Sequence, residues 1–239
     1  MSMIRTEFLE WQKRLHNHPF FGRLDSLVVS GTVQEAFAFI PYMEHFVYTF
    51  KDMLMEMSVK DSDDALQKAV NHHAEEDSEH WVWYIQDINL LEIEGAVKML
   101  SRMELWGEEC AVGRELAAEM LFICKNLRNP YQKMLYIDCM EATYHVFLAH
   151  FPKVAKHFGY HDRLGYFGDQ HAEDEMGHTH IPWHHLPASK YAELERNLSK
   201  KYDLAPTETL RFVRKTFQLF DEMWYFWLEK VDESIDAHR

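Results

Sequence analysis

The sequence predicts an all-α protein built as a single multi-helix domain over residues 1–239, with the layout of a helical bundle. Apolar side chains recur at steps of three and four in every long segment, and strand-like alternation is almost absent. Only nine glycines and seven prolines interrupt the 239 residues. Because about 70% of the unfolded surface is buried at this length, the chain can form a sizeable core.

Four helices are expected in the first half of the chain. The first covers about residues 4–15, and a short one follows at Pro19, since proline is favoured at the first helical position. A threonine N-cap opens a long apolar helix over about 32–57, and a serine N-cap opens the next over about 62–88.

The second half continues the helical pattern. The ranges expected there are about 92–127, as one long or two consecutive helices closed by Asn129-Pro130, then about 131–150 and 161–180. Pro182 and Pro187 bracket a break, and a last helix begins at Pro206. Its apolar face is formed by Leu210, Val213, Phe217, Phe220, Trp224 and Leu228.

The composition argues against several classes of binding partner and cellular location. With 39 acidic and 25 basic residues the net charge is −14, so a nucleic-acid backbone would be repelled and no nucleic-acid partner is expected. No window has the length of uninterrupted apolar sequence that a membrane span requires. Three scattered cysteines and a polar N-terminal segment favour a reducing cytoplasm over a secreted, disulfide-bonded protein.

The run Gln170–His180, QHAEDEMGHTH, has the spacing of metal ligands. His171, Glu175 and His178 fall at i, i+4 and i+7, on the same helical stripe as the apolar side chains around them. Acids and imidazoles on an inward stripe are costly to bury unless they share a cation. The run therefore predicts a metal site, with Asp174 as an alternative to its neighbour Glu175.

Three earlier helices each carry a polar group on an otherwise apolar stripe. Glu44 lies among Phe37, Ile40 and Val47, and Glu141 among Met134, Ile137, Tyr144 and Leu148. His80 is the preferred ligand of the helix between them, with His73 and Glu76 as alternatives. Glu75 and Glu79 lie off the apolar side and are expected on the surface. Glu44, His80, Glu141, His171, Glu175 and His178 form the predicted six-ligand set.

A set of oxygen and nitrogen ligands drawn from four helices suits iron or manganese in a helical bundle. A structural zinc site would more usually include thiolates, and a calcium site would be all oxygen. The Glu-x-x-His pair that ferritin-like di-iron proteins carry on each of two helices is not what this chain offers, since Glu76 to His80 on the earlier helix is one residue too long.

The arrangement resembles the haem-oxygenase-like di-iron oxidases and oxygenases, whose last core helix carries a His-x3-Asp-x2-His motif. Here that motif reads His171-x3-Glu175-x2-His178, with Glu141 some thirty residues earlier and His80 and Glu44 on preceding helices. Two positions differ: the Asp of the motif is Glu175, and a Glu that some members have seven residues before the early histidine is His73.

The resemblance implies two Fe(II) ions, with Glu141 the bridging ligand, and O2 as co-substrate. It also implies a small-molecule substrate, often an amino acid or a fatty acid in this family. In size and overall character the chain is most similar to a member of this family that rearranges a halogenated tryptophan into an indole nitrile, so the expected substrate is an amino acid. A homodimer is a further expectation for a bundle of this kind.

Two other functions remain open from the sequence. A thiamin-degrading hydrolase of the same fold class, of the TenA type, would use a cysteine nucleophile, which would have to be Cys110, Cys124 or Cys139. A metal- or haem-binding module would use His16 or His18 as an axial ligand.

Overall fold

The computed structural model describes residues 2–169, 171–172, 187–237 and 239. All regular elements within these ranges are helices, which confirms the predicted all-α bundle. The α-helices are α1 (Met3–His16), α2 (Pro19–Ser30), α3 (Val33–Ala36), α4 (Glu44–Met57), α5 (Ala65–Asp77), α6 (His80–Ile93), α7 (Arg102–Trp106), α8 (Ala111–Asn126), α9 (Pro130–His157), α11 (Ala188–Lys201) and α12 (Pro206–Ala237). Two short 3-10 helices are η1 (Ile40–Met43) and η2 (Glu108–Cys110).

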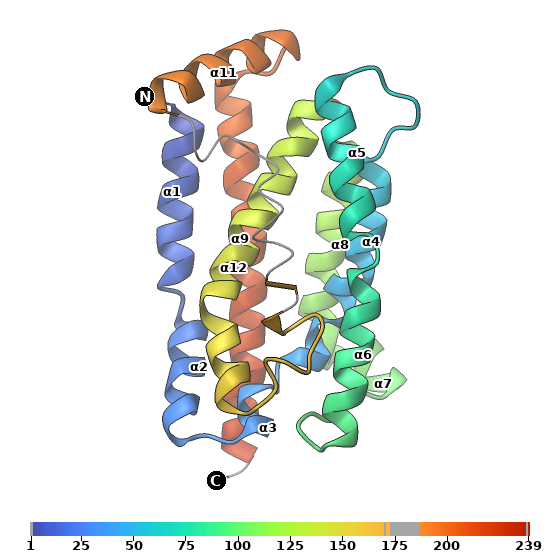
Figure 1. The fold of residues 1–239 in the computed structure, drawn as a ribbon, viewed down its shortest axis with the longest axis vertical. Coiled ribbons are helices and arrows are strands. Elements are labelled where there is room, and N and C mark those ends of the chain that lie inside the picture. The colour runs from blue at the N-terminus through green and yellow to red at the C-terminus, as the bar shows by residue number, and fades with distance from the viewer. Residues whose placement is uncertain (1, 170, 173–186, 238) are drawn as a thin grey trace.

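The long helices α9 and α12 run together along the bundle, and α1 and α2 pack against both of them (Figure 1). On the other side lie α4, α5, α6 and α8, of which α5 contacts α9 and α8 contacts α12 (Figure 1). Helix α11 lies across the end of the bundle near the N-terminus (Figure 1). Buried side chains from both sides form the hydrophobic core. No helix in the described ranges combines the length and the hydropathy needed to cross a bilayer.

The expected helix starts at Pro19 and Pro206 are confirmed. His18 caps α2 by accepting a hydrogen bond from the backbone N–H of Phe20, and proline occupies the first turn of α2. Thr32 likewise forms a capping box with Glu35, as its position before the apolar run predicts.

The predicted single helix over 32–57 is wrong, because it is divided into α3, η1 and α4. Pro41 lies in η1, where it has no N–H to continue the helical hydrogen-bond ladder. Phe37, Ile40 and Glu44 therefore do not lie on one continuous α-helix, and the predicted apolar face that contained all three is absent.

The predicted helix over 62–88 is also divided. Its N-cap is Asp64 instead of Ser62, and a break at Ser78–Glu79 separates α5 from α6. The Ser78 hydroxyl donates to the carbonyl of Glu75 at 3.1 Å, which is the local competition that disfavours serine inside helices. Asp77 therefore ends one helix and His80 begins the next.

The chain between α6 and α8 is less helical than expected over 92–127. Helix α6 ends at Ile93 and is followed, after the C-cap Glu94, by Gly95, whose φ of +69° is a conformation that glycine adopts without strain. Only the short α7 and η2 precede α8. Two helical stretches were not predicted. Helix α9 continues past Pro152 to His157, and α11, which buries Tyr191, was expected to be non-helical.

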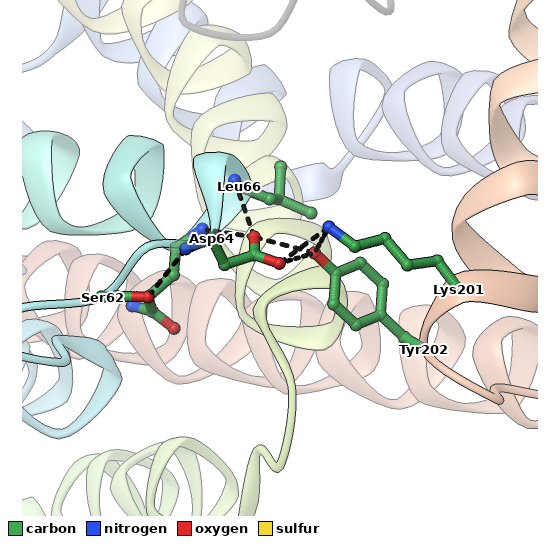
Figure 2. Close-up of polar contacts among 6 residues, drawn as sticks. Ser62, Asp64, Leu66, Lys201 and Tyr202 are labelled. Atoms are coloured by element: carbon green, nitrogen blue, oxygen red, sulfur yellow. Dashed lines mark hydrogen bonds and ion pairs between the residues drawn. The ribbon is translucent and has the colours of Figure 1, made fainter.

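Asp64 joins two helices that are far apart in the sequence (Figure 2). Its carboxylate accepts hydrogen bonds from the backbone N–H groups of Leu66 and Gln67, at 2.9 and 3.2 Å, which caps α5. The same carboxylate lies 2.7 Å from Lys201 Nζ and 2.8 Å from the Tyr202 hydroxyl, at the end of α11. The hydrogen bond from Lys201 lowers the pKa of Asp64 to about 2, with smaller contributions from Tyr202 and the two backbone groups.

Asp64→Asn is expected to lower the free energy of unfolding by about 1 kcal/mol at pH 6, because asparagine keeps the cap and loses the ion pair. The pKa of Asp64 is lower in the folded protein than its value of 3.8 in the unfolded chain. The ion pair therefore stabilises the fold fully at pH values above 3.8, and this stabilisation is lost as the pH falls toward 2. Urea unfolding of both proteins should therefore show a difference that shrinks from pH 4 downward. Asp63→Asn, at an exposed neighbour, is the control; an equal effect there would contradict the assignment.

Candidate metal centre

The chain from 161 to 168 leads into the His171 region as turns and bends, and the predicted helix start at residue 161 is therefore wrong. Asp87 of α6 holds this segment, because its carboxylate accepts from the backbone N–H groups of Gly165 at 2.7 Å and Phe167 at 3.0 Å. Burial raises the pKa of Asp87 to about 6, although these hydrogen bonds favour the ionised form. The buried carboxylate thus fixes the backbone that carries Tyr166 and His171.

A cavity of about 70 Å³ lies inside the bundle. Its wall, within the described ranges, is mostly aromatic and methionine side chains, with acids and imidazoles in one part: Met43, Phe46, Val47, Phe50, Asp77, His80, Trp81, Met140, Glu141, Thr143, Tyr144, Phe147, Tyr166, His171, Phe220, Met223, Trp224 and Trp227. The residues come from η1, α4, α5, α6, α9, α12 and the segment that leads to His171. Three of the predicted ligands, His80, Glu141 and His171, meet at this cavity.

A compact group of donor atoms is formed by His73 and Asp77 of α5 with Glu141 of α9. One donor atom of each residue lies within 4.8 Å of the others. His73 Nε2 is 3.0 Å from Asp77 Oδ2 and 3.5 Å from Glu141 Oε1. His73 and Asp77 are buried, and Glu141 is partly exposed. The direct packing of α5 on α9 brings the three together.

His80 and His171 form the imidazole part of the cavity wall. Their ring centroids are 4.4 Å apart, and both side chains are buried. His80 also stacks on Trp83, with centroids 4.8 Å apart, and the edge of that indole meets His171. Because Asp77 ends α5 and His80 begins α6, the break between these helices turns an acid and an imidazole toward the same cavity.

Two tyrosines orient His171. Its Nδ1 lies 2.9 Å from the carbonyl oxygen of Tyr166 and 2.5 Å from the hydroxyl of Tyr144. A carbonyl oxygen only accepts, so the hydrogen bond to Tyr166 requires the proton on Nδ1 and leaves the Nε2 lone pair for a ligand. Hydrogen bonds of this kind commonly fix metal-binding histidines.

Tyr144→Phe is expected to weaken divalent-metal binding about tenfold, because the ring stays in place and the hydrogen-bond partner of His171 is lost. Titration with Fe(II) under anaerobic conditions, or with Co(II), measures the change. Tyr225→Phe, on a half-exposed ring of α12, is the matched control and should bind as the wild type does. Equal affinities for all three proteins would show that Tyr144 does not support the site.

Glu44 and Glu76 are not brought to this group of donors. Glu44 is buried, and burial raises its pKa, but its electrostatic neighbours are Tyr48 and Tyr84, and the cavity is lined by Met43 and Val47 on either side of it. Glu76 Oε1 lies 3.4 Å from Nε2 of the exposed His72, and the Glu76 side chain is partly buried. The role of Glu44 as a ligand remains a prediction.

The remaining predicted ligands, Asp174, Glu175 and His178, lie outside the described residues. The expectation that Glu75 and Glu79 lie on the surface is confirmed, since both side chains are exposed. Of the alternatives on α5, His73 belongs to the donor group found among the described residues, and the role of Glu76 remains a prediction.

Asp77 is the donor that sequence reasoning missed. It shares a stripe with His73 and His80, and the Asp77-x2-His80 spacing places an acid and an imidazole one turn apart. The Glu-x-x-His motif has the same spacing, but its first residue is glutamate, so that motif does not identify Asp77.

The donor set suits a divalent transition metal. It combines carboxylate oxygens with imidazole nitrogens, and no thiolate is close, which is the preference of iron and manganese. Carboxylates and imidazoles this deep in an apolar wall are costly unless they share positive charge. The group formed by His73, Asp77 and Glu141 could therefore hold a metal ion, and His80 and His171 line the same cavity.

Comparison with known proteins identifies no protein family whose model matches the chain, and no curated protein matches its sequence.

Proposed function

We propose that this protein is a non-haem di-iron oxidase or oxygenase that activates O2 and acts on a small molecule. The observation that carries the proposal is the meeting of two carboxylates, Asp77 and Glu141, with the imidazoles His80 and His171 at one cavity. His73 extends this group from α5. The resemblance to haem-oxygenase-like di-iron proteins supports the same reading.

Asp77, Glu141, His73, His80 and His171 would hold iron. Iron bound there would supply the binding and reduction of O2. The chain itself contributes the surroundings of that chemistry. The aromatic and methionine wall limits water, and the bond from His171 Nδ1 to Tyr166 keeps the Nε2 lone pair available.

The two alternative functions find less support. Cys110, Cys124 and Cys139 are buried, and none is among the described cavity residues. Burial raises the pKa of Cys110 to about 11 and that of Cys124 to about 12, whereas a nucleophilic cysteine needs a lowered pKa. His18, a candidate haem ligand, is buried against Trp224 and Tyr225 and caps α2 through Nδ1. Nδ1 of His16 lies 3.4 Å from Nε2 of His150, and His16 is not among the described cavity residues.

Anaerobic loading with Fe(II) tests the proposal. We expect about two irons per chain after removal of excess metal, and an absorbance change when O2 is admitted. Parallel loading with Mn(II) shows whether the site prefers iron. Protein that retains no iron and shows an unchanged spectrum with O2 would contradict the proposal.

A further inference from the structure

Two histidines outside the candidate metal centre bring their ring nitrogens together. His16 is the last residue of α1, and His150 lies on α9, 134 residues later in the sequence. Nδ1 of His16 is 3.4 Å from Nε2 of His150, and the ring centroids are 5.6 Å apart. Neither residue is among the described cavity residues. The contact therefore forms a second cluster of imidazoles, separate from the one at the cavity.

The distance between the two nitrogens fits a shared metal ion. A hydrogen bond from a protein N–H is usually about 2.7–3.2 Å long, and 3.4 Å exceeds that range. Two imidazole nitrogens that bind one zinc ion at about 2.0–2.1 Å, with the tetrahedral angle between the bonds, lie about 3.3–3.4 Å apart. The observed separation therefore matches two neighbouring ligands of a tetrahedral ion better than it matches a direct hydrogen bond.

Packing holds the His150 ring in place. The ring stacks on Phe21 of α2, with centroids 4.3 Å apart and an angle of 19° between the ring planes. Phe21 is buried and meets the edge of Trp224 in the core, with centroids 4.7 Å apart. Because α1 and α2 both pack on α9, the imidazole of His150 lies where these three helices meet. A ring that is already held loses little conformational freedom when it binds an ion.

The charges around the pair are compatible with a bound cation. Burial lowers the pKa of His150, which keeps the ring neutral at pH 7 and its Nε2 lone pair available. Asp25 of α2 acts on His150 with negative charge, and Lys153 acts with positive charge. Lys153 is exposed, so solvent screens its repulsion of an ion. His16 lies at the C-terminal end of α1, where the helix dipole favours positive charge.

We propose that His16 and His150 together bind a divalent ion of the zinc class, with water in the remaining coordination positions. Imidazole nitrogens suit zinc, nickel and copper, whereas the carboxylate-rich group at the cavity suits iron and manganese. The bound ion ties the end of α1 to α9 and stabilises the junction of the two helices. This site is independent of the proposed function and remains if the cavity binds no iron.

Calorimetric titration with Zn(II) tests the proposal. The full-length Asp77→Asn/Glu141→Gln double variant serves as the background, because its cavity lacks both carboxylates and competes weakly for zinc. His150→Gln and His16→Asn are each added to this background, and His157→Gln, at an exposed histidine of the same helix, is the matched control. We expect either of the first two changes to weaken zinc binding at this site at least about tenfold, and the control to leave it unchanged.

Thermal unfolding with an intact cavity gives a second measurement. Zinc should raise the unfolding midpoint of the wild type more than that of His150→Gln or His16→Asn, because an ion that binds only the folded chain stabilises it. Midpoints without metal show whether each variant folds normally. His16 is exposed at a helix end, so its variant keeps the test valid even if His150→Gln is unstable.

The outcomes separate this site from the iron centre. Normal Fe(II) loading of His16→Asn together with weakened zinc binding would place the zinc ion at the histidine pair. Zinc affinity and stoichiometry that are equal in the background protein and all three variants would overturn the proposal, and so would a background protein that binds no zinc.

Discussion

Asp77→Asn and Glu141→Gln are each expected to weaken Fe(II) binding at least about 100-fold and to abolish the absorbance change with O2. Both substitutions keep the shape of the side chain and remove the negative charge that a divalent ion needs. Loss of a hydrogen-bond partner one shell away from a metal commonly costs 10- to 100-fold in affinity, so loss of a direct carboxylate ligand should cost at least as much. Anaerobic titration followed by metal analysis measures the change.

Glu75→Gln is the matched control for these variants, because Glu75 lies on the same helix as Asp77 and is exposed. It should bind iron as the wild type does. Helicity and the unfolding midpoint of all three proteins, measured without metal, establish that the fold is intact. Retention of normal affinity by the Asp77 and Glu141 variants would remove the basis for a metal centre at these residues.

Gly168→Ala is expected to produce the largest loss of stability from a single methyl group, roughly 2–4 kcal/mol. A Cβ at this position would lie 2.0 Å from the carbonyl oxygen of Leu164 and 2.5 Å from that of His161. Both are backbone atoms, which cannot rotate away as a side chain can. The segment that carries His171 would have to move, so metal binding should fall together with the free energy of unfolding.

Gly22→Ala provides the opposite expectation for the same chemical change. Nothing lies within 4 Å of a Cβ built at Gly22, which is inside helix α2. Alanine is favoured over glycine there by roughly 0.5–1 kcal/mol, so this variant should be slightly more stable. Denaturant unfolding compares the two variants. A Gly168→Ala protein as stable as the wild type would show that the tight segment around residue 168 is misplaced.

Local sequence determined much of the fold. Proline and capping residues predicted the starts of α2 and α12, and the threonine before residue 33 predicted a capping box. These features depend on neighbours within a few residues, which is why a sequence reveals them. The polar groups at His80, Glu141 and His171 stood out because each interrupts an apolar stripe, and the structure brings all three to one cavity.

Sequence pattern alone therefore predicts the all-helical class and several donors on inward-facing stripes. The tertiary structure decided which donors meet. Residues 37–43 interrupt the expected helix before Glu44, and the break at Ser78–Glu79 separates Asp77 from His80, which line one cavity. It also decided that the cavity wall lacks lysine and arginine within the described ranges. Helical periodicity fixes directions only within an unbroken helix, whereas contacts between helices depend on where each helix stops and how it packs.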